Sequence, residues 1–346
     1  MDQVFLKKLT EARPTDFGLT LAPMPKSGRQ KGIEMKVEYS GKDFWKNYMT
    51  TWFGEELIDK WEKYVELEQI DSAQGKINIE IYKTVDLSKP TIVFSHGIAG
   101  YARVLLPFLI PLFEKGYNII APDLEGYGYN DRLKGDFTWD IHLQNLKDTV
   151  DYAKTVFNGK VFLGGGSMGG PLAYATDVRY NCVDGLICWC LWDLADREFM
   201  NKETNTKRLT YPMMPFLRLL SALFGTLRLK TYYFVSYDTL TDSEEFNNLL
   251  KTDPQAGTLI SLRGATSLVT QSRPDIKHEH YEKPVLVCQP EQDKMTPGYY
   301  TKKTFKKIKS EKKQYQSFEG AHFPTDKQTY VKWAECVDRF LKWLEK

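Results

Sequence analysis

The segment from Lys160 to Ala175 places an apolar run directly before a glycine-rich turn that carries one serine. Its letters, KVFLGGGSMGGPLAYA, predict a strand that turns sharply into a helix, with Ser167 at the apex. The spacing G-x-S-x-G, here Gly165 to Gly169, is typical of a nucleophile elbow. The serine needs a strained backbone there, and the flanking glycines let strand and helix pass closely. The pentapeptide alone is a weak signal, so the prediction depends on a base, an acid and oxyanion donors elsewhere in the chain.

The composition is that of an ordinary globular protein. With 346 residues the chain is long enough for about two domains. Its hydrophobic content of 42% and charged content of 27% are typical of soluble proteins. Basic and acidic residues are interleaved and the net charge is only +2, so we expect no nucleic-acid partner. No apolar run reaches the length of a membrane span, and the N-terminus lacks a signal-peptide pattern.

The cysteines favour a cytoplasmic location. They are odd in number, lie mostly in apolar runs and show neither CxxC nor Cys/His ligand spacing. We therefore expect buried, reduced thiols and no metal site. The five residues are Cys182, Cys188, Cys190, Cys288 and Cys336. The serine chemistry that the elbow indicates needs no organic cofactor either.

The order of the predicted elements indicates a mainly parallel sheet with helices on both faces. Strands alternate with helices from residue 64 onward, and such crossovers are right-handed by rule. The functional site of such a sheet lies at the carboxyl ends of its strands. Helices are predicted to start at Thr138 and at Asp326. The predicted strands are Val65–Ile70 and Ile77–Val85 as a hairpin, Thr91–Ser95, Asn118–Ala121, the run before the elbow, Gly185–Leu191, Pro284–Gln289 and Gln314–Phe318.

Two segments fall outside this alternation. Residues 1–62 include most of the aromatic-rich stretch Phe44–Lys63 and are predicted to form an N-terminal extension packed on the core. Residues 194–281 are too long for a loop and are predicted to form an inserted, mostly helical cap over the site. The core then consists of residues 63–193 and 282–346.

Within the insertion, Thr210–Val235 is apolar and holds two methionines but only three charges. A lid wall of this kind suits an acyl chain or another hydrophobic group. The same face suits transient contact with lipid, although its prolines and charges argue against a membrane span. We expect the substrate to contact Met213, Met214, Phe216 and Leu220.

A serine hydroxyl needs an adjacent base to act as a nucleophile near neutral pH. His322 follows the last predicted strand and precedes the closing helix, which places it on the same edge of the sheet as Ser167. We therefore predict that His322 is the base. The other histidines are assigned to a loop (His96), a helix (His142) and charged surroundings in the insertion (His278 and His280).

The base needs a carboxylate that orients its ring and stabilises the imidazolium ion. Asp293 follows the penultimate strand, and the order Ser167, Asp293, His322 is the one this architecture uses. Asp193, after the Gly185–Leu191 strand, is the rival candidate, and Glu291 is a weaker one.

A tetrahedral intermediate needs two backbone donors. One is expected to be the N–H of Met168, the residue after the nucleophile. The other is expected from the loop after the Thr91–Ser95 strand, at Ile98. Their side chains matter little because the donors are backbone groups.

With these residues in place, the sequence resembles the α/β-hydrolases, and among them the monoacylglycerol lipase and lysophospholipase-like serine hydrolases. The matching segments are His96-Gly97-Ile98, Pro122–Gly128, the elbow, the Asp293 loop and Gly320-Ala321-His322, and the insertion segment Asp242–Leu268 resembles the cap of that group. The resemblance extends over about residues 64–346. It implies an α/β-hydrolase fold with a helical cap inserted after the strand that follows the nucleophile helix.

The function predicted from the residues and the resemblance is a serine hydrolase that cleaves a carboxylic ester with an apolar acyl part through an acyl-enzyme. A thioesterase, an acyl-homoserine lactonase or an aminopeptidase would use the same triad, although no acidic site for a substrate amine is evident. A protein of another class, which binds ligand in a hydrolase-like pocket without turnover, is the remaining alternative. The expected partner is a small acyl ester.

Overall fold

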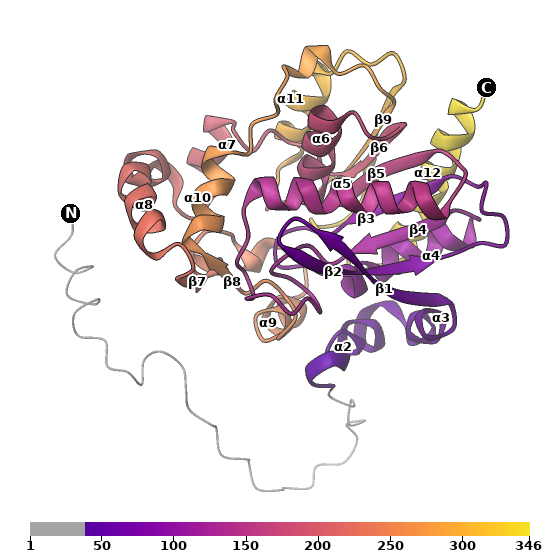
Figure 1. The fold of residues 1–346 in the computed structure, drawn as a ribbon, viewed down its shortest axis with the longest axis horizontal. Helices are drawn as coiled ribbons and strands as arrows, with labels where there is room; N and C mark the ends of the chain where they lie inside the picture. The colour runs from indigo at the N-terminus through magenta and orange to yellow at the C-terminus, as the bar shows by residue number, and fades with distance from the viewer. Residues whose placement is uncertain (1–38) are drawn as a thin grey trace, which may run out of the picture. The chain divides into compact units, whose positions relative to one another are not determined.

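The computed structural model describes residues 39–346 of the chain, and strands and helices alternate through most of it (Figure 1). Eight strands form one sheet in the order β1-β2-β4-β3-β5-β6-β9-β10. The first two neighbouring pairs, β1–β2 and β2–β4, are antiparallel, and every pair from β4 to β10 is parallel. The strands are β1 (Val65–Ser72), β2 (Gly75–Tyr82), β3 (Thr91–Ser95), β4 (Asn118–Pro122), β5 (Val161–Gly166), β6 (Gly185–Trp189), β9 (Val285–Pro290) and β10 (Lys313–Phe318).

This sheet confirms the predicted mainly parallel α/β architecture. Each predicted strand is present, with small shifts at its ends. Alternation of side chains along the strands gives the sheet two buried faces, because successive residues point to opposite sides. In β3, Ile92 and Phe94 join one hydrophobic cluster and Val93 joins the other.

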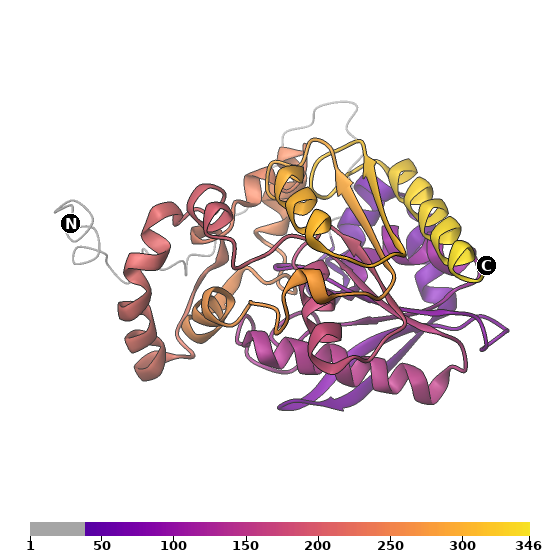
Figure 2. The same cartoon turned by 90° about the horizontal axis from the view of Figure 1, so that it is seen from above.

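Helices cover both faces. The hydrophobic cluster that contains Ile92 and Phe94 includes side chains of α4 (Leu106–Glu114) and α12 (Lys327–Leu344). A short helix, η4 (Ala102–Leu105), precedes α4. The other cluster contains α5 (Trp139–Val156) and α6 (Gly169–Tyr180). Figure 2 shows α5 and α12 on opposite sides of the sheet. The remaining helix of this region is α11 (Gly298–Lys307), between β9 and β10.

Capping residues start two of these helices at the predicted positions. The side chain of Thr138 accepts a hydrogen bond from the N–H of Ile141 at the start of α5. The side chain of Asp326 accepts from the N–H groups of Gln328 and Thr329 at the start of α12. These bonds satisfy donors that the first helical turn leaves without intrahelical partners.

The segment before β1 is a run of short helices. Its aromatic side chains, including Trp45, Tyr48 and Phe53, are buried in the same cluster as α4 and α12. This part of the predicted N-terminal extension therefore packs on the core, and residues 1–38 of that extension lie outside the described residues. The elements are η2 (Gly41–Asp43), α2 (Lys46–Tyr48), η3 (Met49–Phe53, one π-helical turn) and α3 (Glu56–Tyr64).

Between β6 and β9 the chain leaves the sheet and forms the insertion, which gathers beyond one end of the strands (Figure 1). It is mostly helical, and it also contains a two-stranded antiparallel sheet that we did not predict. None of the helices in residues 39–346 is long and apolar enough to cross a bilayer. The elements are α7 (Arg197–Lys202), η5 (Lys207–Leu209), α8 (Thr210–Phe224), β7 (Arg228–Lys230), η6 (Thr231–Tyr233), η7 (Tyr237–Thr239), α9 (Glu244–Leu250), β8 (Leu259–Ser261), α10 (Leu262–Thr270) and η8 (His278–His280).

Candidate active site

The turn between β5 and α6 presents Ser167 at the carboxyl end of the sheet. The φ angle of Ser167 is 56°, in the left-handed region that residues other than glycine rarely adopt. Strand and helix approach so closely that a Cβ on Gly165 would lie 2.6 Å from the carbonyl carbon of Gly169. A Cβ on Gly169 would lie 2.5 Å from the oxygen of Ser95 in β3. The glycines are thus required by close backbone approach, as the motif predicts.

His322 lies in the loop between β10 and α12, and it is almost completely buried. Its Nδ1 is 2.7 Å from Oδ2 of Asp293, in the loop after β9. Two further hydrogen bonds hold this loop: Trp189 Nε1 donates to the His322 oxygen at 3.0 Å, and the N–H of Phe323 donates to the oxygen of Leu240 at 2.9 Å. The second bond ties the histidine loop to the insertion.

The two rival acids lie elsewhere. Oδ2 of Asp193 is 3.5 Å from Nε2 of His278, within a separate pair. Glu291 is exposed. The structure therefore pairs His322 with Asp293 and not with either rival.

Five donors surround the carboxylate of Asp293. Oδ1 accepts from the N–H groups of Met295 at 2.9 Å and Thr296 at 2.7 Å. Besides the imidazole, Oδ2 accepts from Nε2 of Gln289 at 3.0 Å and from the thiol of Cys190 at 3.5 Å. With both oxygens held, the carboxylate has a fixed orientation toward the ring.

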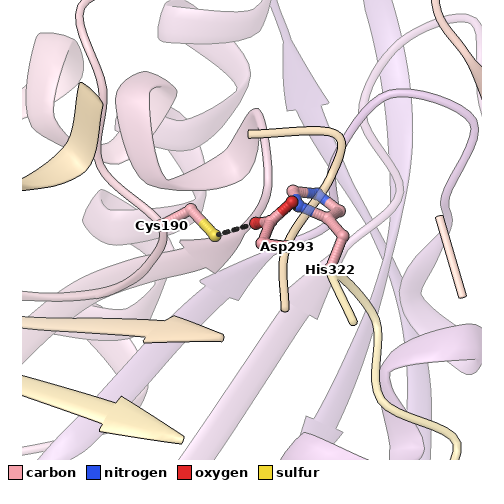
Figure 3. A group of neighbouring side chains, drawn as sticks. All are labelled: Cys190, Asp293 and His322. Atoms are coloured by element: carbon pink, nitrogen blue, oxygen red, sulfur yellow. Dashed lines mark hydrogen bonds and ion pairs between the residues drawn. The ribbon is translucent and has the colours of Figure 1, made fainter. Parts of the chain in front are cut away.

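Sequence reasoning did not identify Cys190 or Gln289. Figure 3 shows Asp293 between Cys190 and His322, and these three are the group of described residues whose atoms lie close enough to hold a metal ion, all within 4.8 Å. Burial, and then the adjacent carboxylate, raise the pKa of the Cys190 thiol well above its ordinary value. The thiol thus stays protonated and acts as a donor to Asp293, so the cluster is better explained as a hydrogen-bonded chain than as a ligand set.

Ser167 and His322 line the same cavity. Nε2 of His322 is buried, and no atom within residues 39–346 forms a hydrogen bond with it. The Ser167 side chain instead lies against the backbone of Gly97. Hydrogen bonds between a nucleophile and its base are often absent without substrate, and rotation about the serine χ1 bond changes the direction of the hydroxyl.

The loop after β3 is held in place by a buried imidazole. His96 Nδ1 lies 2.7 Å from the oxygen of Gly97, and the N–H of Leu124 donates to His96 Nε2 at 3.0 Å. Since Nε2 accepts, Nδ1 carries the proton, and burial lowers the pKa of His96 to about 4. Because a trans peptide points its C=O and N–H in opposite directions, holding the Gly97 oxygen directs the N–H of Ile98 to the other side.

The expected oxyanion donors are both available. Among the described residues, no backbone hydrogen bond outside the regular elements uses the N–H of Ile98 or of Met168. Met168 is the N-cap of α6, where the helix dipole favours negative charge. Ile98 lines the cavity together with Ser167.

The cavity beside Ser167 has a volume of about 60 Å³ and a predominantly apolar wall. The core supplies part of this wall, and the insertion supplies the rest from the segment between Val235 and Leu250. No aspartate or glutamate is among the lining residues. The apolar side chains are Ile98, Ala99, Val104, Leu105, Phe108, Trp189, Val235, Tyr237, Leu240, Phe246, Leu250, Met295 and Phe323.

The four predicted substrate contacts need correction, because none of them lines this cavity. They belong to α8, whose Met214 is buried, whereas Met213 is 41% and Phe216 58% exposed. Leu220 is partly buried on the same helix. The apolar composition of α8 thus serves packing on one side and an exposed face on the other.

The remaining histidines are distant from this chemistry. His142 is buried in α5, with Nε2 3.0 Å from the oxygen of Glu125, and burial lowers its pKa to about 3. His278 lies 3.0 Å from the hydroxyl of Tyr174, and His280 is exposed. The cavity wall therefore contains His96 and His322, and only His322 has an uncommitted nitrogen.

The mainly parallel sheet and the strand–serine–helix elbow define an α/β-hydrolase. Residues 87–322 match the model of the family described as serine aminopeptidase, S33, and the chain belongs to this family. No match was found among curated proteins.

Solved structures with the same fold include three hydrolases. The monoacylglycerol lipase of Paleococcus ferrophilus has a TM-score of 0.59 at 17% identity, over 78% of this chain and 98% of that one. A soluble variant of monoglyceride lipase from Saccharomyces cerevisiae has a TM-score of 0.61 at 16% identity, over 80% of this chain and 96% of that one. A carboxyl esterase from Bacillus coagulans has a TM-score of 0.63 at 14% identity, over 81% of this chain and 98% of that one. At these identities the likeness establishes the fold.

Proposed function

We propose that this protein is a serine hydrolase of carboxylic esters that acts through an acyl-enzyme on Ser167. One observation carries the proposal: the unpartnered Nε2 of His322 lies in the wall that also holds Ser167, while Nδ1 is bound to Asp293. A nitrogen in this state accepts a proton, and the paired carboxylate stabilises the resulting imidazolium ion.

In the proposed reaction, His322 takes the hydroxyl proton as Ser167 Oγ attacks the carbonyl carbon. The N–H groups of Ile98 and Met168 bind the oxygen that becomes negative. The imidazolium ion then gives its proton to the departing alkoxide, which leaves as an alcohol. Water next loses a proton to His322 and attacks the acyl group, and the acid leaves as Ser167 regains its proton.

The cavity supports an ester with a small apolar acyl group. Its wall is mostly aliphatic and aromatic. The cavity has a volume of about 60 Å³, which is smaller than the ~150 Å³ of a dry protein cavity that binds benzene. An aminopeptidase would need an anionic group for the substrate amine, and the lining residues include no acidic side chain. The lining thus favours ester hydrolysis within a family that is described by its aminopeptidases.

Replacing the nucleophile tests the proposal. Ser167→Ala is expected to abolish hydrolysis of p-nitrophenyl acetate and butyrate, because the proposed acyl-enzyme forms on the hydroxyl that this change removes. A fluorophosphonate probe should label wild type at Ser167, as read by mass spectrometry, and leave the variant unlabelled. Lactones, thioesters and aminoacyl amides assayed beside the esters would reveal a different substrate class. Absence of both turnover and labelling in wild type would instead support a binding protein without catalysis.

We further propose that the exposed face of η5, α8 and the turn after them contacts an anionic lipid surface. Large apolar side chains lie there, most of them three or four residues apart, and they are 41–64% exposed. No acidic residue occurs between Glu203 and Asp238, whereas five basic ones do. The apolar residues are Leu209, Met213, Phe216, Leu219, Leu223, Phe224 and Leu227, and the basic ones are Lys207, Arg208, Arg218, Arg228 and Lys230.

The charges favour a bilayer over a second copy of the chain. Two such faces brought together would place like charges in contact, whereas anionic headgroups attract the basic residues by about 1 kcal/mol each. An amphipathic helix with an apolar face and basic neighbours is typical of interfacial binding. We also keep the expectation of a cytoplasmic location, which the five free, buried cysteines support.

A further inference from the structure

An aromatic segment before the sheet packs against the wall of the active-site cavity. This segment, Phe44–Phe53, is called the aromatic strap here and comprises α2 and η3. It lies outside residues 87–322, which match the family. Its partner in the insertion is α9, which carries the cavity-lining residue Phe246.

Three rings of the strap surround Phe246. The ring centroids of Tyr48 and Trp52 lie 4.9 and 5.0 Å from that of Phe246, and the centroid of Phe53 lies at 6.3 Å. Phe53 also lies 5.9 Å from Phe323, the residue after His322. These separations are those of favourable aromatic pairs. The strap thus contacts two side chains of the cavity wall, one from the insertion and one from the histidine loop.

The buried carboxylate of Asp253, in the insertion, accepts hydrogen bonds from the strap and from the core. The hydroxyl of Tyr48 donates to Oδ2 of Asp253 at 2.9 Å, and the hydroxyl of Tyr101 donates to the same oxygen at 2.8 Å. Asp253 belongs to the insertion, and Tyr101 follows the loop that carries Ile98. Asp253 and both tyrosines are almost completely buried, so moving either hydroxyl away from the carboxylate would leave that hydroxyl without a partner away from water.

We propose that the aromatic strap holds Phe246 and Phe323 in place and thereby sets the length of acyl chain that the cavity accepts. The inference rests on the proposed ester hydrolysis. No residue of the strap lines the cavity, so the strap acts by positioning two residues that do. Phe246 lines the cavity, so an acyl chain that extends past it displaces its ring, and packing against three strap rings opposes that movement.

Shortening a strap ring tests this role. Phe53→Leu removes ring contacts to both wall residues while it retains an apolar side chain of moderate size. The ratio of kcat/KM for p-nitrophenyl octanoate over p-nitrophenyl acetate is expected to rise at least about 10-fold, the discrimination that one methylene of pocket space provides. The gain should come from a lower KM for octanoate, with kcat for acetate unchanged because Phe53 itself lies outside the cavity that holds Ser167 and His322.

A second variant covers the case in which Phe53→Leu does not fold. Tyr48→Phe keeps the ring against Phe246 and removes only the donor to Asp253, so the same ratio is expected to rise by a smaller factor. Phe340→Leu is the matched control: Phe340 is fully buried in α12, and its recorded ring contact is with Trp343. This control lowers stability without touching the cavity wall.

The outcomes separate the two proposals. Inactivity of wild type toward all esters would overturn the proposed function. An active wild type with the same chain-length profile in both folded strap variants would overturn the strap's role alone. An equal rise in the Phe340→Leu control would also overturn it, because the effect would then follow from general loss of stability.

Discussion

At the scale of single residues, the candidate site depends on how closely the Gly97 backbone approaches Ser167. A Cβ built on Gly97 would lie 2.7 Å from Cβ and 3.2 Å from Oγ of Ser167. The first of these is closer than real Cβ atoms come to a neighbour. Any side chain at this position must therefore displace either the nucleophile or the loop that carries the N–H of Ile98.

We predict that Gly97→Ala lowers kcat for p-nitrophenyl acetate by at least about 100-fold, the usual result of losing one oxyanion donor. Little change in melting temperature is expected, because the substitution is confined to a loop at the cavity. A kcat within a few-fold of wild type would contradict the proposed oxyanion hole.

Two buried imidazoles predict how stability depends on pH. Burial lowers the pKa of His96 to about 4 and that of His142 to about 3, whereas both titrate near 6.5 in the unfolded chain. Below pH 6.5 the unfolded state binds protons that the native state does not, so the free energy of unfolding falls as the pH falls. The loss ends only when the folded-state pKa values are reached.

Urea unfolding at pH 6.5 and pH 5 measures this effect. Each imidazole is expected to contribute a loss of between ~1 and ~2 kcal/mol over that interval, because the slope reaches its full ~1.4 kcal/mol per pH unit only well below pH 6.5. His142→Gln should therefore show a shallower decline than wild type, although it is less stable at pH 7. Equal slopes for the two proteins would show that His142 does not remain neutral in the folded state.

The sequence was sufficient to locate the candidate residues that follow strands, but not the residues around them. Ser167 is marked by its motif, and Asp293 and His322 by their positions after consecutive strands. Cys190 and Gln289 carry no such mark. Cys190, whose thiol contacts Asp293, has a backbone φ angle of 69°, in the left-handed region. Residue type alone does not show that the backbone adopts this conformation or which way the side chain then points.

At the scale of elements, periodicity was a good guide to the sheet and a poor one to the insertion. Uncharged runs such as Gly185–Leu191 predict buried strands, because a strand covered on both faces excludes charge. In α8, by contrast, apolar residues lie on the exposed side as well as the packed side. Composition alone therefore could not show which residues of the insertion line the cavity, and these proved to lie between residues 235 and 250.

At the scale of the whole molecule, the basic and apolar face of the insertion predicts binding to anionic vesicles. Full-length protein should sediment with phosphatidylglycerol vesicles and not with phosphatidylcholine vesicles, and rising salt should weaken the binding because it screens the charges. The double variant Phe216→Ser/Leu223→Ser is expected to weaken binding at least about 10-fold, since each side chain buried in lipid contributes over ~1 kcal/mol.

Val85→Ser is the matched control, because Val85 is fully exposed in the loop after β2, far in sequence from this face. It should bind like wild type. Equal binding to both kinds of vesicle would contradict the proposed role of the basic residues. A stable dimer that the double variant disrupts would show that a second copy covers the face.

The backbone hydrogen bond from Phe323 to Leu240 has a consequence for how large ligands reach the serine. It connects the residue after the proposed base, His322, to Leu240, which lines the cavity from the insertion. Displacement of Leu240 therefore also displaces the backbone next to the imidazole. Admission of a bulky ligand and alignment for proton transfer are then one linked event. A ligand that forces Leu240 outward would gain room and lose reactivity together.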